Sequence, residues 1–175
     1  MDLLDLYDRG TAWAGSKIPG AVDKLDSSTP CDEWNVRALI NHMLHGHELF
    51  AGAARGESAA PPPGTPPELI GDDPAAQYET ARQATLDAYR DPAILEKAGM
   101  TLGIGFVDQL VHGWDLAKAT GQDTTMPEDL AAAAYSMIEG RMPPDQRHGF
   151  FKPEVPVGED ASAQEKLLGY GGRQP

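Results

Sequence analysis

The stretch that decides the fold is GFVDQLVHGWDLAKATG, residues 105–121, which reads as one helix closed by Gly121. Asp108 and His112 lie four residues apart in it. A helix would project both side chains from one face, about 6 Å apart at Cβ, so that both can reach one point. A carboxylate and an imidazole that meet in this way can ligate a divalent ion. The stretch therefore predicts half of a metal site.

A second segment, residues 35–54, supplies a third candidate ligand. His42 lies among the apolar residues Leu39, Ile40 and Met43, so it faces inward if this segment packs as a helix. Two imidazoles and one carboxylate form a workable ligand set for a divalent metal and leave coordination positions open. We therefore predict a metal site made of His42, Asp108 and His112. The alternative for His112 is a core histidine that donates a hydrogen bond to Asp108.

Polar residues close to these three have weaker claims. His45 lies three residues after His42 and is the reserve ligand, whereas His47 is rotated well away; both are expected at the surface or at a pocket rim. Asp115, three residues after His112, fits two readings equally. It could accept a hydrogen bond from a metal-bound histidine, or it could be a solvated or interhelical carboxylate.

Two kinds of side chain near the predicted helix starts and ends are assigned to packing. Trp34 and Trp114 are expected to anchor helix ends. Cys31 is expected to be a small buried apolar residue, although a thiolate just before a helix is the other possibility. No catalytic side chain is assigned beyond the metal ligands.

Composition limits the class of protein. The chain has 175 residues, which by length predicts a single domain, residues 1–175, with a sizeable core. Its 14 basic and 27 acidic residues give a net charge of −13, which disfavours nucleic acids and anionic membranes as partners. The first 25 residues carry no secretory pattern, and the single cysteine excludes an internal disulfide. A soluble cytoplasmic protein is expected.

The rest of the chain predicts helices and almost no period-two alternation. The expected helices cover residues 2–16, a short piece before Ser27, 35–56, 73–90, a short piece at 93–98, 105–121, 130–140 and 161–168. Residues 57–73 contain five prolines and predict a long exposed connection that could border the entrance to the site. Residues 143–158 are expected to be irregular, and His148 is given no role. The prediction is an all-α bundle with one long crossover.

Three runs carry a family resemblance: TPCDEWNVRALINH at 29–42, VHGWDLAKATG at 111–121 and KLLGYGGRQP at 166–175. They look like an actinobacterial branch of the DinB/YfiT-like superfamily, and more closely like the metal-binding domain of mycothiol-dependent maleylpyruvate isomerase. The resemblance implies a four-helix bundle with a metal at one end. It also implies the same ligands: His42, eight residues after Trp34, and the pair Asp108 and His112. The isomerase resembled has Glu where this chain has the shorter Asp108.

The resemblance further implies a thiol chemistry. The expected function is a metal-dependent S-transferase or isomerase-like enzyme that activates a low-molecular-weight thiol, with mycothiol as cosubstrate and a small electrophile as the second partner. Zn²⁺ is the expected metal, with Ni²⁺ or Fe²⁺ as alternatives. A homodimer is plausible for such bundles. The competing readings are a non-catalytic bundle that binds a metal or small molecule, and a metal-free helical protein.

Overall fold

The chain is described by a computed structural model for residues 2–31, 34–60, 64–141 and 152–175. Its regular elements in these ranges are helices, and the only β pairing among them is an isolated antiparallel bridge between Ser28 and Asn35. The elements are α1 (Leu3–Gly15), the 3-10 turn η1 (Val22–Lys24), α2 (Val36–Ala54), α3 (Pro74–Ala88), α4 (Pro92–Thr120), α5 (Glu128–Ile138) and α6 (Ala163–Tyr170). The all-α prediction is confirmed.

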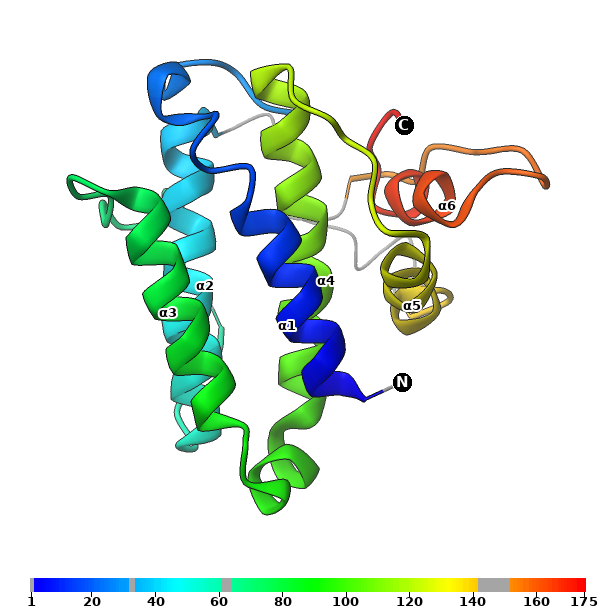
Figure 1. Cartoon of the computed structure of the whole chain (residues 1–175). Helices are drawn as coiled ribbons and strands as arrows, with labels where there is room; N and C mark the ends of the chain where they lie inside the picture. The colour runs from blue at the N-terminus through cyan, green and yellow to red at the C-terminus, as the bar shows by residue number, and fades with distance from the viewer. Residues whose placement is uncertain (1, 32–33, 61–63, 142–151) are drawn as a thin grey trace. The chain divides into compact units, whose positions relative to one another are not determined.

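The chain packs into two compact units, Met1–Thr124 and Thr125–Pro175. The first unit is a closed four-helix bundle, because α1 packs on α3 and α4, and α2 packs on the same two helices. Figure 1 shows α1 and α4 running in one direction and α2 and α3 in the other. Consecutive helices α2 and α3 are therefore parallel, and the chain between them must return along the length of the bundle.

Short polar side chains and special residues set the helix ends where the sequence predicts them. The Asn35 side chain accepts a hydrogen bond from the Ala38 amide at the start of α2, and Asp73 caps α3 with Pro74 as its first residue. Gly121 closes α4 with φ of 71°, a left-handed conformation that glycine adopts without steric cost. Asn35 and Asp73 thus mark the starts of α2 and α3, and Gly121 marks the end of α4.

The sequence prediction for residues 91–105 is wrong. Asp91 and Pro92 begin a helix, and α4 then continues for 29 residues through Gly99 and Gly105 instead of restarting after them. The glycines serve packing here: a Cβ at Gly105 would lie 2.8 Å from the ring of Phe50 in α2. The close approach of α2 and α4 requires a residue without a side chain at this position, and tertiary packing outweighs its low helix propensity.

The Pro-rich crossover is non-helical in its described parts, residues 57–60 and 64–73. It is tied to α2 by Asn41, whose side-chain oxygen accepts hydrogen bonds from the Leu69 amide (2.8 Å) and the Ile70 amide (2.9 Å). Gln77 of α3 adds a bond to the Leu69 carbonyl. The end of the crossover is therefore held against α2 by Asn41, the residue that precedes His42 in sequence.

An apolar core lies between the helices of the bundle. Its fully buried members come from α1, the following turn, α2, α3 and α4: Ala14, Ile18, Ala21, Val36, Leu39, Ile40, Met43, Leu44, Tyr78 and Leu116. Burial of these side chains provides the main stabilisation of the bundle, at roughly 25 cal/mol per Å² of apolar surface. The predicted inward stripe of residues 35–54 is confirmed by this cluster.

The second unit contains α5 and α6, which pack on each other. Ser162 and Glu165 form a reciprocal capping box at the start of α6, and the Tyr135 and Tyr170 rings meet edge to face. The expectations for residues 143–151 and for His148 lie outside the described residues. Among the helices of the described ranges, none combines the length and apolarity that crossing a bilayer requires.

Candidate metal centre

His42, Asp108 and His112 lie together between α2 and α4. The His42 Nε2 atom is 3.2 Å from Asp108 Oδ1, and the His112 Nε2 atom is 3.4 Å from the same oxygen. The two imidazole rings meet edge to face with centroids 4.7 Å apart. Both histidines are buried, while the Asp108 side chain keeps 18% of its exposure. Asp108 is thus the least buried side chain of the three.

The sequence brings these three residues together by two simple periodicities. Asp108 and His112 are one turn apart on the same face of α4, and His42 belongs to the buried face of α2 that packs on α4. Although Asp108 is one methylene shorter than glutamate, its carboxylate reaches both rings in this packing.

Electrostatics couple the three side chains. Burial alone would raise the pKa of Asp108, but the charges of His42 and His112 and hydrogen bonds from both rings outweigh it and hold this pKa well below its usual range. Burial would lower the pKa of His112, but the Asp108 charge and hydrogen bonds to Asp108, Asp115 and Cys31 raise it well above its ordinary value. A cation that bound here would therefore displace a proton from His112.

The cluster fits a divalent cation in two respects. Ligand atoms about 2.0–2.2 Å from a tetrahedral ion lie roughly 3.3–3.5 Å from one another. The two Nε2-to-Oδ1 distances of 3.2 and 3.4 Å are close to this spacing. In addition, the Asp108 Oδ2 atom is buried without a hydrogen-bond partner among the described residues. A buried carboxylate oxygen with no donor is costly, and a nearby cation would remove that cost.

The far side of the His112 ring faces another carboxylate. Asp115 is fully buried, and its Oδ2 atom lies 3.1 Å from His112 Nδ1. Asp115 is therefore a buried hydrogen-bond acceptor for His112 and not a solvated carboxylate.

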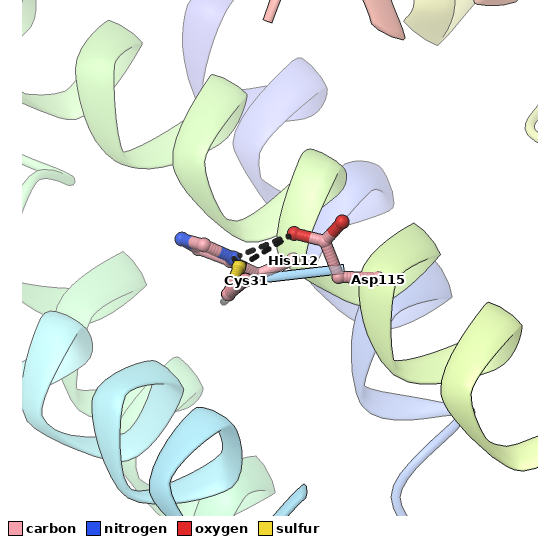
Figure 2. Close-up of side chains that lie close together, drawn as sticks. All are labelled: Cys31, His112 and Asp115. Atoms are coloured by element: carbon pink, nitrogen blue, oxygen red, sulfur yellow. Dashed lines mark hydrogen bonds and ion pairs between the residues drawn. The ribbon is translucent and has the colours of Figure 1, made fainter. Parts of the chain in front are cut away.

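Cys31 also belongs to this cluster, which the sequence does not predict. Its Sγ donates a hydrogen bond to Asp115 Oδ2 at 3.3 Å and lies 3.8 Å from His112 Nδ1 (Figure 2). The thiol is half-buried rather than an apolar core residue. The only hint in the sequence is its position in the loop that leads into α2.

Trp34 does more than anchor a helix end. Its ring lies against His42 with centroids 4.6 Å apart and an interplanar angle of 34°, and its centroid is 5.9 Å from that of His112. The indole therefore covers both imidazoles on one side. An eight-residue separation from His42 is the signal in the sequence, since Trp34 precedes the cap of the helix that carries this histidine.

The other two histidines of α2 lie outside this cluster. His45 is half-buried and is not among the grouped side chains that could hold an ion in the described residues. The expectation of a surface position is wrong for His47, which is completely buried and hydrogen-bonded to the Tyr7 hydroxyl at 2.8 Å. The reason is that α2 is covered by α3 as well as by α4, so a residue rotated away from α4 still faces the interior.

His47 makes a testable prediction about acid stability. Burial, followed by the charge of Arg82, lowers the pKa of His47 from 6.5 to about 3. Below pH 6.5 the unfolded chain takes up a proton that the folded chain refuses, so the stability present above this pH is lost as the pH falls toward about 3. Each pH unit costs up to about 1.4 kcal/mol, or about 2–3 kcal/mol between roughly pH 6.5 and 4.5.

Urea unfolding of the wild type and of His47→Gln at both pH values measures this effect. The variant should show a smaller loss of unfolding free energy by about that amount, because glutamine does not titrate while its amide can still bond Tyr7. Comparing the change in unfolding free energy between the two pH values cancels the contribution of the carboxylates and any pH-independent loss of stability in the variant. An equal pH dependence of the unfolding free energy in the two proteins would show that folding does not lower the pKa of His47.

The register of α4 is set beside the ligands by a buried amide. Gln109 is fully buried; its Oε1 accepts from the Tyr78 hydroxyl at 2.9 Å, and its Nε2 donates to the Met43 carbonyl at 3.1 Å. The Tyr78 hydroxyl also contacts the Thr11 carbonyl of α1. Gln109, adjacent to Asp108 in sequence, thus connects α4 to α2 and α3, and the Tyr78 hydroxyl extends this network to α1.

The chain is similar to known proteins over much of its length. The family model of the mycothiol maleylpyruvate isomerase N-terminal domain matches residues 20–117, which include Cys31, Trp34 and all three clustered side chains. Curated relatives include an uncharacterized protein of Mycobacterium tuberculosis, found in strain CDC 1551 / Oshkosh and in strain ATCC 25618 / H37Rv. Each is 30% identical over 187 residues, which cover 99% of this chain and 98% of the relative. No solved structure matches the chain significantly. The chain therefore belongs to the mycothiol maleylpyruvate isomerase N-terminal domain family.

Proposed function

We propose that this protein is a metal-dependent enzyme that transfers a low-molecular-weight thiol to a small electrophile. His42, Asp108 and His112 are the proposed ligands of one divalent ion, most suitably Zn²⁺, for which two imidazoles and a carboxylate are a known ligand set. The observation that carries the proposal is their convergence around Asp108, with its second oxygen buried and unsatisfied. The family description adds mycothiol as the candidate thiol.

The bound ion would supply one effect, a lower pKa of a thiol or water molecule that contacts it, so that thiolate exists at neutral pH. The chain's own side chains provide the rest. Asp115 holds the His112 ring in orientation from the Nδ1 side, and Trp34 shields both imidazoles from water on one side. Access for thiol and electrophile is proposed on the side where Asp108 is partly exposed.

The proposed reaction forms one carbon–sulfur bond. With a haloarene, the thiol sulfur bonds to the ring carbon, the carbon–halogen bond breaks, and the halide and the thiol proton leave together as acid. With an epoxide, a carbon–oxygen bond breaks and the epoxide oxygen takes up the thiol proton. No side chain serves as the nucleophile, in keeping with the absence of an assigned catalytic residue beyond the ligands.

The test begins with elemental analysis of untagged protein purified without chelator, which should show about one divalent ion per chain. The loaded protein is then given mycothiol with a haloarene or an epoxide, and thiol loss is followed over time. We expect thiol consumption that His42→Ala and His112→Ala each slow strongly. Metal binding without thiol loss would instead support a non-catalytic binding protein, and protein without metal would overturn the proposal.

A further inference from the structure

The loop before α2 places a thiol behind the His112 ring. The Thr29 hydroxyl accepts from the Cys31 amide at 3.1 Å and donates to the Trp34 carbonyl at 2.7 Å, and the Trp34 amide donates to the Cys31 carbonyl at 2.9 Å. These bonds hold Cys31 and Trp34 in one tight turn, so the loop presents a thiol and an indole to the same imidazole. Figure 2 shows Cys31 beside the ring and the carboxylate of Asp115.

The hydrogen-bond partners of His112 indicate which of its ring nitrogens carries a proton when an ion is bound. Asp115 Oδ2 is an acceptor and lies within reach of two donors, the Cys31 thiol at 3.3 Å and His112 Nδ1 at 3.1 Å. A neutral His112 that donates from Nδ1 must leave its Nε2 lone pair bare. Nε2 is the atom that faces Asp108 and His42. The contacts on one side of the ring thus prepare the opposite nitrogen for a cation.

The same three atoms could also be read as a second ion site. Cys31 Sγ, His112 Nδ1 and Asp115 Oδ2 all lie within 4.8 Å of one another. However, ions on both sides would need an imidazole that has lost both ring protons. The first cluster has the buried Asp108 Oδ2 atom in need of a positive partner, whereas Asp115 Oδ2 already has two donors. The observations therefore favour the cation at Nε2 and hydrogen bonds at Nδ1.

We propose that Cys31 is a positioning residue of the metal centre, which acts through Asp115 to hold His112 in the tautomer and orientation that binds the ion. This inference rests on the proposed function, because a positioning role requires a bound ion. The hydrogen bonds that join Cys31, Asp115 and His112 are present without the ion. The thiol donates to Asp115, and Asp115 accepts from His112. Cys31 neither contacts the ion nor serves as a nucleophile.

The test is a double-mutant cycle on Zn²⁺ affinity, measured by competition with a chelator. Cys31→Ala and Asp115→Asn should each lower the affinity by about 10- to 100-fold, the usual effect of removing a partner behind a ligand histidine. Cys31→Ser keeps a donor and should recover most of the loss. The double variant should be no weaker than Asp115→Asn alone, because the thiol acts through that carboxylate.

Two further readouts separate positioning from ligation and from folding. Co²⁺-loaded wild type should lack a thiolate-to-metal charge-transfer band, since the thiol is not a ligand. In metal-free protein, ¹⁵N NMR should show the His112 Nδ1 proton held in a hydrogen bond to Asp115, and Cys31→Ala should weaken this bond while thermal unfolding stays close to wild type. A charge-transfer band that Cys31→Ala removes, or wild-type affinity in Cys31→Ala, would overturn the inference.

The NMR measurement also distinguishes the two proposals. If the wild type binds no divalent ion, the proposed function fails, yet the hydrogen bond of the His112 Nδ1 proton in wild type and in Cys31→Ala still tests the hydrogen-bond chain. An unchanged Nδ1 hydrogen bond in Cys31→Ala would reject the role of Cys31 even if the wild type binds Zn²⁺ tightly.

Discussion

Replacement of His112 with alanine is expected to abolish tight Zn²⁺ binding. The side chain supplies one of the three proposed ligand atoms and is also the ring that Asp115 and Cys31 contact, so the substitution removes a proposed ligand and its supporting contacts together. The loss should greatly exceed the roughly 10- to 100-fold effect of removing a partner behind a ligand. Isothermal titration with Zn²⁺ and elemental analysis measure it directly.

His45→Ala is the matched control for this substitution. His45 is a half-buried histidine on the same helix as His42, outside the cluster, so its variant should bind Zn²⁺ like the wild type. Because His112→Ala also breaks a buried ion pair, it could lose several kcal/mol of stability. His42→Ala provides a second ligand deletion without the contacts to Asp115. Tight one-to-one binding in both folded ligand variants would contradict the assignment of the centre.

Divalent metal is expected to raise the thermal stability of the protein markedly. An ion that binds only the folded chain at a free concentration of 100 times its Kd stabilises it by about 2.7 kcal/mol. For a chain of this size that corresponds to a rise in Tm of roughly 5–11 °C. The proposed ligands His42 of α2 and Asp108 of α4 are 66 residues apart in sequence, so unfolding of the bundle must separate them.

A thermal scan with Zn²⁺, with Zn²⁺ plus excess EDTA, and with neither measures this increase. EDTA should return the Tm to the metal-free value, and His45→Ala should respond as the wild type does. His42→Ala and His112→Ala should show little response to Zn²⁺. An equal rise in the ligand variants would mean that the ion stabilises the fold from a different position.

Local patterns in the sequence carry much of the fold and of the cluster. The helical spacing of Asp108 and His112 places them on one face, and the apolar neighbours of His42 place it on the buried face of α2. Asn35 and Asp73 begin their helices and Gly121 ends its helix where expected. These features depend on interactions within a few residues, which is why the sequence alone predicts them.

The missed features depend on contacts between distant segments. A buried His47 requires knowledge that α3 covers the second side of α2, and the unbroken α4 requires knowledge that Gly105 faces Phe50. The placement of Cys31 beside Asp115 joins residues 84 apart in sequence. No periodicity within one helix reports on such contacts.

The amide of Gln109 has a consequence for how the bundle can vary. A shift of α4 by one residue would move the Gln109 side-chain oxygen and nitrogen away from Tyr78 and Met43 and leave them buried without hydrogen bonds. Alternative alignments of the helices therefore cost free energy. The double substitution Gln109→Leu and Tyr78→Phe is expected to preserve the stability of the bundle while allowing more than one register of α4 against its neighbours. Such a protein would keep its helices but no longer bring the imidazole rings together at one point. The reason is that this buried hydrogen-bond network selects one helix arrangement among several that apolar packing alone would allow.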